Sequence, residues 1–215
     1  MSNVPAMNPS ALHLQNLACM RGGKTLFSDL SLVLEPGHLL RITGSNGTGK
    51  SSLLRMLCGL LTPSMGSIQW GVSSIDADRD SFHTQLIYLG HTPALKGDLS
   101  AEENIISAGN LSGDVITSSM ARSALVSSGL GHLASKLART FSQGQKQRVA
   151  LARLQLAQDK PLWLLDEPFN ALDHDANEAL QVLIQGHLTR GGMVALSSHQ
   201  AVALDQIDRV VRVNL

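Results

Sequence analysis

The sequence lacks the cysteine pairs, the long apolar runs and the charge excess that mark secreted, membrane-spanning or nucleic-acid-binding chains. It has two cysteines, Cys19 and Cys58, and neither belongs to a CxxC pair or has metal-ligand spacing. A chain of 215 residues can bury enough apolar surface to fold without disulfides, so we expect two reduced thiols and a reducing compartment. The length suits a single domain, residues 1–215, with at most a modest insertion.

Cationic excess and aromatic side chains are scarce as well. Lys and Arg together number 17 and are balanced by 17 Asp and Glu, while aromatic residues make up 3% of the chain. Because nucleic-acid binding draws on a cationic surface and on aromatic stacking, we expect no nucleic-acid partner.

Apolar runs are only a few residues long, far short of the roughly 20 residues that a membrane helix needs. Met1–Ser10 has neither the basic start nor the apolar core of an export signal. We therefore expect the protein to stay in the cytosol unless a partner holds it at a membrane.

Short apolar runs alternate with helical patterns along the chain. An alternating strand leads to a turn at Pro36-Gly37, and a short apolar strand then runs into a glycine-rich loop. The helix after the loop is expected to end at Thr62-Pro63. Its apolar face consists of Leu53, Leu54, Leu57 and Leu61. Further strands are predicted at QLIYLG, PLWLLD, MVALSS and DRVVRV, so the pattern predicts an α/β fold with a largely parallel sheet.

Residues 92–140 differ in composition from the rest, being small, polar and helix-compatible. Ser100, with Glu103 three positions later, predicts a capping box at a helix start. We expect residues 92–140 to form a helical insertion, with residues 1–91 and 141–215 forming the nucleotide-binding core around it.

The glycine-rich loop, GSNGTGKS, fits the pattern G-x-x-x-x-G-K-[ST] and lies between a predicted strand and a predicted helix. Backbone N–H groups of such a loop wrap a β-phosphate, and Lys50 supplies a positive charge to the β and γ oxygens. Ser51 is expected to ligate Mg²⁺ and Ser52 to reach the α-phosphate. A glycine-rich turn with a chance lysine is the alternative, and the position between strand and helix argues against it. The expected nucleotide-binding residues here are Gly44, Ser45, Asn46, Gly47, Thr48, Gly49, Lys50, Ser51 and Ser52.

An acidic pair follows the apolar run PLWLL. Asp166 is suited to hold Mg²⁺ and Glu167 to polarise an attacking water, so we predict a metal ligand and a catalytic base. A strand-end acidic pair is by itself also compatible with simple capping, and a phosphate loop alone leaves kinases, GTPases, motors and transporters open. The two motifs together favour hydrolysis of a nucleoside triphosphate.

A second anion-binding pattern, FSQGQKQRVALAR, occupies Phe141–Arg153. Unpaired N–H groups at a helix start, beside a small hydroxyl residue, favour a phosphate there as well. The sequence thus has two separate phosphate-binding motifs, and the loop at Gly44–Ser51 already supplies the first.

With this motif just upstream of LLDEPFNALD, and with SSH at Ser197–His199, the chain resembles the ATP-binding subunits of ABC transporters over essentially its whole length. The resemblance implies an ABC ATPase fold with an antiparallel N-terminal β region, and ATP and Mg²⁺ as cofactors. It implies that Asn170–Asp173 is the D-loop and that His199 touches the γ-phosphate. It also implies a head-to-tail homodimer, in which the signature motif of one chain covers the nucleotide held by its partner. The signature residues are Ser142, Gln143, Gly144 and Gln145, preceded by Phe141.

Three positions depart from the pattern of that family. Gln143 stands where the first signature glycine is usual, although Ser142 and Gly144 remain. Arg21 stands where an aromatic residue usually stacks on adenine, and a guanidinium can stack too. His91 stands at the position of the Q-loop glutamine, which usually contacts Mg²⁺ and the membrane subunit.

The small size of the chain and the patterns LGHxPxLK and FSxGQxxRVALARL are similar to the ATP-binding subunits of bacterial cytochrome c maturation systems, the haem exporters. That resemblance implies a peripheral protein on the cytoplasmic face of the inner membrane, docked on integral membrane subunits. Hydrolysis would then be linked to release of a haem-loaded periplasmic chaperone.

Other assignments remain open from the sequence. The ATPase of an ordinary solute transporter would share the same motifs. A soluble ABC protein of DNA repair or translation would need a coiled-coil insertion, tandem nucleotide domains or a basic patch, and the sequence has none of these. The His, Cys and Met residues have no ligand spacing, so we do not expect this subunit to bind haem.

Overall fold

Two β-sheets form the frame of the protein in the computed structural model, which describes residues 7, 9–199, 204 and 209–215. The expectation about an export signal falls largely on residues outside that description. The first sheet is antiparallel and the second is parallel throughout, as the sequence predicted. The antiparallel sheet has the order β2-β1-β4-β5, from β1 (Leu12–Arg21), β2 (Lys24–Leu34), β4 (Met65–Trp70) and β5 (Ser73–Ser74). The parallel sheet has the order β6-β7-β8-β3-β9, from β3 (Leu39–Thr43), β6 (Leu86–Leu89), β7 (Leu162–Asp166), β8 (Met193–Ser197) and β9 (Val210–Asn214).

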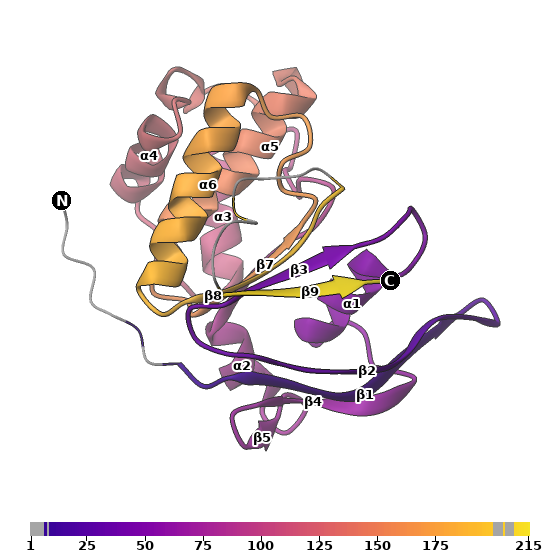
Figure 1. Cartoon of the computed structure of the whole chain (residues 1–215). Helices are drawn as coiled ribbons and strands as arrows, with labels where there is room; N and C mark the ends of the chain where they lie inside the picture. Colours follow the sequence, from indigo (N-terminus) through magenta and orange to yellow (C-terminus); the bar gives the residue numbers. More distant parts are fainter. Residues whose placement is uncertain (1–6, 8, 200–203, 205–208) are drawn as a thin grey trace.

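The parallel sheet is covered on both faces, which is why β7 and β8 are buried at every position. Helix α1 (Lys50–Leu57) packs on one face, where its Leu53 and Leu54 join Leu164 of β7 in one apolar cluster. Helix α6 (His174–Thr189) covers the other face, where Ile184 packs with Trp163. Figure 1 shows α6 above this sheet and α1 beneath it. Because the strands are parallel, the loops that follow β3, β7 and β8 leave the sheet at one common edge.

Helix α1 is shorter than the sequence predicted, because it ends at Leu57 rather than at Thr62. Gly59 adopts a left-handed backbone with φ of 72°, and the N–H of Leu60 turns back to the carbonyl of Arg55 at 2.8 Å. This is a glycine stop at the position after the C-cap. Leu61 therefore lies beyond the helix, where it still packs against the apolar cluster beneath the sheet.

The predicted capping box is confirmed at the start of α3, where the hydroxyl of Ser100 accepts from the N–H of Glu103 and the Glu103 carboxylate accepts from the N–H of Ser100. The apolar cluster of this region continues into α5, which contributes Val149 and Ala152. The division of the chain at residues 92 and 140 stays a prediction. The helices other than α1 and α6 are α2 (Arg79–Thr84), α3 (Ala101–Leu111), α4 (Ser118–Ser127) and α5 (Gln143–Ala152). Short 3₁₀ turns lie at Gly131–Leu133, Ala138–Thr140 and Arg153–Gln155.

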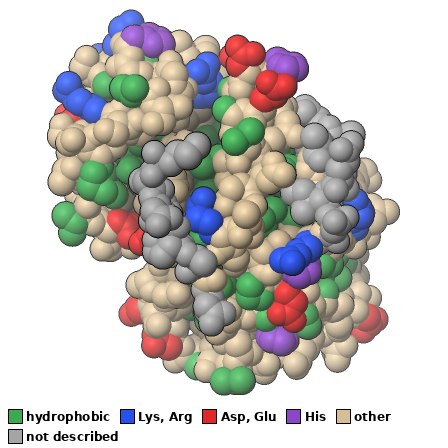
Figure 2. Space-filling view, turned by 60° about the vertical axis from the view of Figure 1, so that its left-hand side comes forward, with side chains coloured by type: hydrophobic (Ala, Val, Ile, Leu, Met, Phe, Trp, Pro, Cys, Tyr) green, Lys and Arg blue, Asp and Glu red, His purple; other side chains and the backbone are tan. Residues whose placement is uncertain are grey.

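Over the described ranges, no helix combines the length and the apolar character needed to cross a bilayer. The face in Figure 2 carries cationic and anionic side chains scattered among polar ones. Cys19 and Cys58 are both free and buried, and burial raises the pKa of the Cys58 thiol to about 11. The thiol of Cys58 therefore stays protonated and unreactive at neutral pH.

One ionisable side chain, His187 of α6, lies fully buried between the sheet and Gly192. Its ring stacks on Trp163 at a centroid distance of 3.8 Å, and its Nε2 lies 3.3 Å from the carbonyl of Pro161. A Cβ on Gly192 would meet the ring at 2.2 Å, so the glycine makes room for it. Burial is the largest cause and lowers the pKa of His187 to about 4; the bond to Pro161 opposes that shift, and the smaller effect of the Arg190 charge adds to it.

His187 should therefore make the fold sensitive to acid. The unfolded chain takes up a proton near pH 6.5 while the folded chain does so only near pH 4, so stability falls as the pH drops through that window, by about 3 kcal/mol at most. His187→Phe keeps a stacked ring that does not titrate. Urea unfolding at pH 7.5 and pH 5 should show a smaller loss for this variant than for the wild type. His174→Phe, at an exposed position, should lose as much as the wild type, and an equal loss in all three proteins would contradict the assignment.

Candidate functional site

The phosphate loop lies between the end of β3 at Thr43 and the start of α1 at Lys50, where the sequence predicted it. Gly44 has φ of 139°, and a Cβ there would lie 2.5 Å from the carbonyl oxygen of Leu215. Gly49 caps α1 with φ of 114° and has the ring of Phe27 at 3.1 Å from its Cβ position. Both glycines are needed because the backbone turns through a left-handed conformation in a crowded place. The loop therefore presents its N–H groups at a helix start, where an anion is favoured.

Lys50 is only 7% exposed, and its side chain is bonded to the backbone of the phosphate loop. Its ammonium donates to the carbonyl of Gly44 at 2.8 Å and to that of Ser45 at 2.9 Å. An ammonium has three protons, so one remains for a ligand above the loop. Ser51 and Ser52 follow in the first turn of α1, and Asn46 and Gly47 form the exposed crest of the loop.

A pocket of about 680 Å³ lies over the phosphate loop. Its wall combines Arg21 and Leu26 from the β1–β2 hairpin, His91 after β6, and Glu167 and His199 at the ends of β7 and β8. The volume is within the range of sites for small-molecule ligands. Four residues that are far apart in the sequence and that were predicted to belong to the nucleotide site, Arg21, His91, Glu167 and His199, thus line one cavity.

Asp166 and Glu167 are both buried at the end of β7, with 2% and 8% of their surfaces exposed. They are joined by Ser197, whose hydroxyl donates to Asp166 Oδ1 at 2.7 Å and accepts from the N–H of Glu167 at 2.9 Å. No sequence motif predicts a separate role for Ser197. The available signal was its place at the end of an apolar strand, directly before the histidine.

His199 lies against the predicted base. Its Nε2 is 3.1 Å from Glu167 Oε1, which is an ion-pair distance, although Oε1 has no hydrogen-bond partner of good geometry. The side chain of His199 is 43% exposed and that of Glu167 is 9% exposed. The histidine is thus on the more solvent-exposed side of the pair, and both side chains line the pocket.

A metal ligand is chemically possible at Asp166. Its Oδ2 is buried and has no hydrogen-bond partner among the described residues, while Oδ1 is occupied by Ser197. Ser51 lines the pocket. Asp166 is not among the lining residues but directly precedes Glu167, which is. A carboxylate oxygen and a hydroxyl, completed by water and phosphate oxygens, are donors that Mg²⁺ accepts. The described chain has no group of three or more His, Cys, Asp or Glu that could hold a metal without such help.

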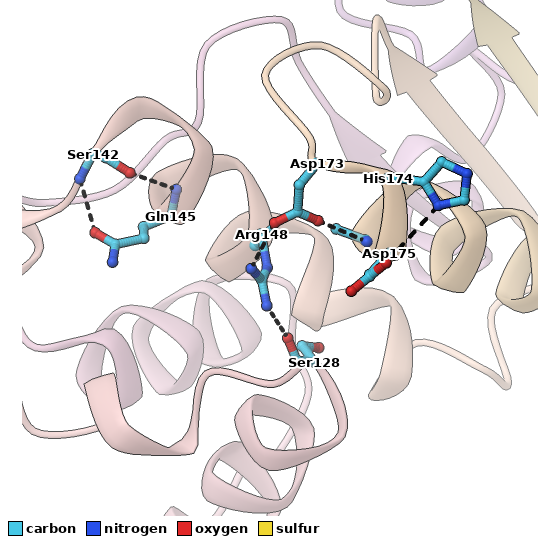
Figure 3. Close-up of polar contacts among 8 residues, drawn as sticks. Ser128, Ser142, Gln145, Arg148, Asp173, His174 and Asp175 are labelled. Carbon is cyan, nitrogen blue, oxygen red and sulfur yellow. Dashed lines mark hydrogen bonds and ion pairs between the residues drawn. The ribbon is translucent and has the colours of Figure 1, made fainter.

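The signature residues lie outside this pocket. The described lining contains none of Ser142–Gln145. Ser142 is the N-cap of α5, where its hydroxyl accepts from the N–H of Gln145 at 3.2 Å and its own N–H donates to Gln145 Oε1 at 2.9 Å (Figure 3). Gln143 is exposed at the first position of the helix. A single chain therefore presents its two predicted phosphate-binding motifs in two different places.

Helix α5 is fastened to the loop that follows Glu167 by contacts that the sequence did not reveal. A Cβ on Gly144 would lie 2.7 Å from the carbonyl oxygen of Ala171, and Gln147 donates to the carbonyl of Pro168 at 3.3 Å. Arg148 reaches Asp173 at 3.3 Å and also donates to the carbonyl of Ser128 at 3.0 Å (Figure 3). The spacing of positions 144, 147 and 148 places all three on one helix face. Helix α5 and the predicted D-loop are thus packed together within one chain.

The strand–loop–helix phosphate cradle, the strand-end acids and the parallel sheet define a P-loop nucleoside triphosphatase. The ABC transporter family matches residues 27–170. A putative ABC transporter ATP-binding protein from Pyrococcus furiosus has a similar structure, with a TM-score of 0.81 at 25% identity, covering 96% of this chain and 98% of that one. A dimeric ATP-binding cassette bound to ADP and phosphate, at 23% identity, covers 88% of each chain with a TM-score of 0.74 and shows the likeness of fold. The chain belongs to the ABC transporter family, as an ATP-binding subunit with ATPase chemistry.

Within that family the chain is similar to the cytochrome c biogenesis ATP-binding export proteins CcmA. It is 47% identical to the CcmA protein of Dechloromonas aromatica over 191 residues, which is 89% of this chain and 93% of that protein. It is 40% identical to the CcmA protein of Haemophilus influenzae over 199 residues, 93% of each chain.

The packing of Gly144 predicts that this glycine contributes to the stability of the fold even without nucleotide or a second chain. Gly144→Ala should lower the stability of the nucleotide-free protein by about 1–3 kcal/mol, because the new methyl group meets a backbone oxygen. Gly186→Ala is the matched control, since that helical glycine has only the flexible end of Arg190 at 3.5 Å and should gain up to about 1 kcal/mol. Urea unfolding measures both, and a Gly144→Ala protein as stable as the wild type would refute the packing argument.

Proposed function

We propose that the protein is the ATP-hydrolysing subunit of a bacterial inner-membrane ABC complex of cytochrome c biogenesis, the haem export system. The observation that carries this proposal is the 47% identity to CcmA over 89% of the chain. It is supported by the pocket that gathers Lys50, Glu167 and His199. Hydrolysis in this subunit would drive release of the haem-loaded chaperone on the periplasmic side.

The residues of the pocket divide the work between binding and hydrolysis. The loop N–H groups and Lys50 hold the β- and γ-phosphates of ATP, and Ser52 reaches the α-phosphate. Glu167 is the general base that takes a proton from the attacking water, because its carboxylate is buried at the pocket wall. His199, on the solvent side of Glu167, donates to the γ-phosphate and so leaves the carboxylate free for water.

Ser51 and the unpaired Oδ2 of Asp166 would hold Mg²⁺, together with water and the phosphates. The ion, when bound, supplies positive charge to the β- and γ-phosphate oxygens. Arg21 is exposed and lines the pocket, and it would stack on adenine through its guanidinium. His91 takes the Q-loop position between the core and the helical region, where it would sense both the nucleotide and a membrane subunit.

A homodimer gives the two phosphate motifs one common purpose. Because Ser142–Gln145 lies outside the pocket of its own chain, it is available to cover the nucleotide in the pocket of a second chain. A head-to-tail pair with two-fold symmetry makes two such composite sites. ATP then holds the dimer closed, since the signature contacts exist only in the dimer, and hydrolysis removes them.

The protein would act at the cytoplasmic face of the inner membrane, held there by integral membrane subunits of the cytochrome c maturation complex. It would take no haem itself. Haem would be handled by the partner proteins, with this subunit supplying the energy.

The variant Glu167→Gln tests two hypotheses, namely that Glu167 is the general base and that the protein acts in cytochrome c biogenesis. The amide keeps the shape of the side chain and loses the proton acceptor, so ATP should still bind while turnover falls by at least about a hundredfold. Gel filtration with ATP and Mg²⁺ should then show a trapped dimer. In a deletion strain the variant should fail to restore c-type cytochromes, which the wild-type gene should restore.

The outcomes separate the site from the pathway. A fully active Glu167→Gln protein would refute Glu167 as the base. A wild-type gene that restores no cytochromes, although its product hydrolyses ATP, would exclude the haem system and favour the ATPase of another solute transporter.

A mixed dimer tests whether the signature serves the partner's nucleotide. One chain carries Lys50→Ala and the other Ser142→Arg, and the pair is purified through two different tags and assembled with the membrane subunits. If the motifs meet across the interface, one composite site collects both lesions and the other is intact. Vanadate should then trap one nucleotide per mixed dimer, and none in either pure mutant dimer.

The opposite result has an equally clear form. If each signature served its own chain, both sites of the mixed dimer would carry one lesion. No nucleotide would then be trapped, and the composite-site proposal would be wrong. Counting trapped nucleotide rather than turnover avoids confusion with a requirement that both sites act together.

A further inference from the structure

A single hydroxyl, that of Ser197, connects the two acidic residues at the end of β7. Ser197 is fully buried at the end of β8 and pairs directly with Asp166 in the register of the two parallel strands. Side chains at such paired positions lie about one strand spacing apart, roughly 4.8 Å. Asp166 and Ser197 are therefore held side by side by the sheet itself.

The hydroxyl has a fixed direction because its neighbours allow only one. The N–H of Glu167 can only donate, so the Ser197 oxygen accepts from it at 2.9 Å. The single hydroxyl proton then points to Asp166 Oδ1 at 2.7 Å. This leaves Asp166 Oδ2 as the carboxylate oxygen that has no partner and is still buried. Ser197 thus decides which oxygen of Asp166 remains available.

The same hydroxyl holds the backbone of Glu167 in an unfavourable conformation. Glu167 has φ of 52°, a left-handed value that non-glycine residues seldom adopt, because their Cβ crowds the following carbonyl oxygen. Its N–H is held by Ser197, and its carbonyl accepts from the N–H of Asn170 at 3.2 Å. This backbone turn places the Glu167 side chain in the wall of the pocket.

We propose that Ser197 is a positioning residue for ATP hydrolysis, which presents Asp166 Oδ2 to the metal and fixes the direction of the Glu167 carboxylate. The inference rests on the proposed ATPase function. Ser197 does not line the pocket and acts only through its two neighbours. Its removal should therefore impair turnover and leave ATP binding largely intact, because the phosphate loop is untouched.

Ser197→Ala, Ser197→Thr and Ser100→Ala test this role. Ser197→Ala removes the hydroxyl, and Ser197→Thr keeps it. Ser100→Ala is the matched control, because that buried hydroxyl also accepts from a backbone N–H, at 3.2 Å from Glu103, but at the start of α3. Amide hydrogen exchange in the nucleotide-free subunit is measured first, followed by kcat, the KM for ATP and the Mg²⁺ concentration for half-maximal turnover in the complex with the membrane subunits.

For Ser197→Ala we expect exchange at the Glu167 amide to rise at least about tenfold and kcat to fall by about ten- to a hundredfold, with the KM for ATP within about threefold of the wild type. More Mg²⁺ should be needed for half-maximal turnover. Ser197→Thr should restore kcat to within a few fold. Ser100→Ala should leave exchange at Glu167 and turnover unchanged.

Two results would overturn the proposal. The first is wild-type exchange at Glu167 together with wild-type kcat in Ser197→Ala. The second is a parallel loss of kcat and stability in Ser197→Ala and Ser100→Ala, which would mean that either buried hydroxyl merely stabilises the fold. Should Ser197→Thr not fold, the comparison of the two alanine variants still decides. A wild-type protein without ATPase activity would instead refute the proposed function, and the exchange measurement would remain valid.

Discussion

Parallel pairing of β3, β7 and β8 is the constraint on which the site depends. In a parallel sheet all strands end at one edge, so Thr43, Asp166 and Ser197 arrive there together although long stretches of sequence separate them. Parallel strands require crossover connections, and the helices of those connections must cover both faces. The apolar clusters around α1 and α6 are therefore a consequence of the same pairing that assembles the phosphate loop and the acids.

The loop after β7 holds two of the four non-glycine residues that have a positive φ in the part of the chain that the structure describes. Glu167 and Ala171 have φ of 52° and 60° in a loop of seven residues, Glu167–Asp173, that α5 contacts. Strained residues of this kind persist only where the surroundings hold them. Here Ser197 holds the start of the loop, and Arg148 contacts its end through Asp173. The loop between Glu167 and α6 is thereby fixed at both ends within a single chain.

The sequence was sufficient for the features that are local. The phosphate loop, the capping box at Ser100 and the strand-end acids each depend on a few adjacent residues, so their patterns can be recognised from the sequence without knowledge of the fold. The predicted end of α1 was wrong. The apolar spacing continues to Leu61, but the left-handed conformation of Gly59 ends the helix before that residue. A periodic pattern indicates which residues are buried, but it does not indicate which of them are helical. Leu61 shows the difference, because it packs on the apolar cluster although it lies beyond the helix.

Features that depend on register or on packing between distant elements could not be read in advance. The role of Ser197 follows from its pairing with Asp166, and a shift of one residue would have turned its side chain to the other face. The contact of Gly144 with Ala171 and the stack of His187 on Trp163 need the relative placement of whole helices. Arg21 and His91 are candidate nucleotide-site residues only because of the family resemblance. The structure adds that both line the same cavity.

The order of the strands also has a consequence for how the chain folds during synthesis. Strand β3, which leads into the phosphate loop, pairs only with β8 and β9 in the parallel sheet, and both come after residue 192 in the sequence. Such distant pairings are slow to form because a long loop must close first. A nascent chain therefore carries an apolar strand with two open edges for most of its translation, and open edges invite aggregation. The motif that is translated early is completed late, so newly made subunits would depend on chaperones until their last strands emerge.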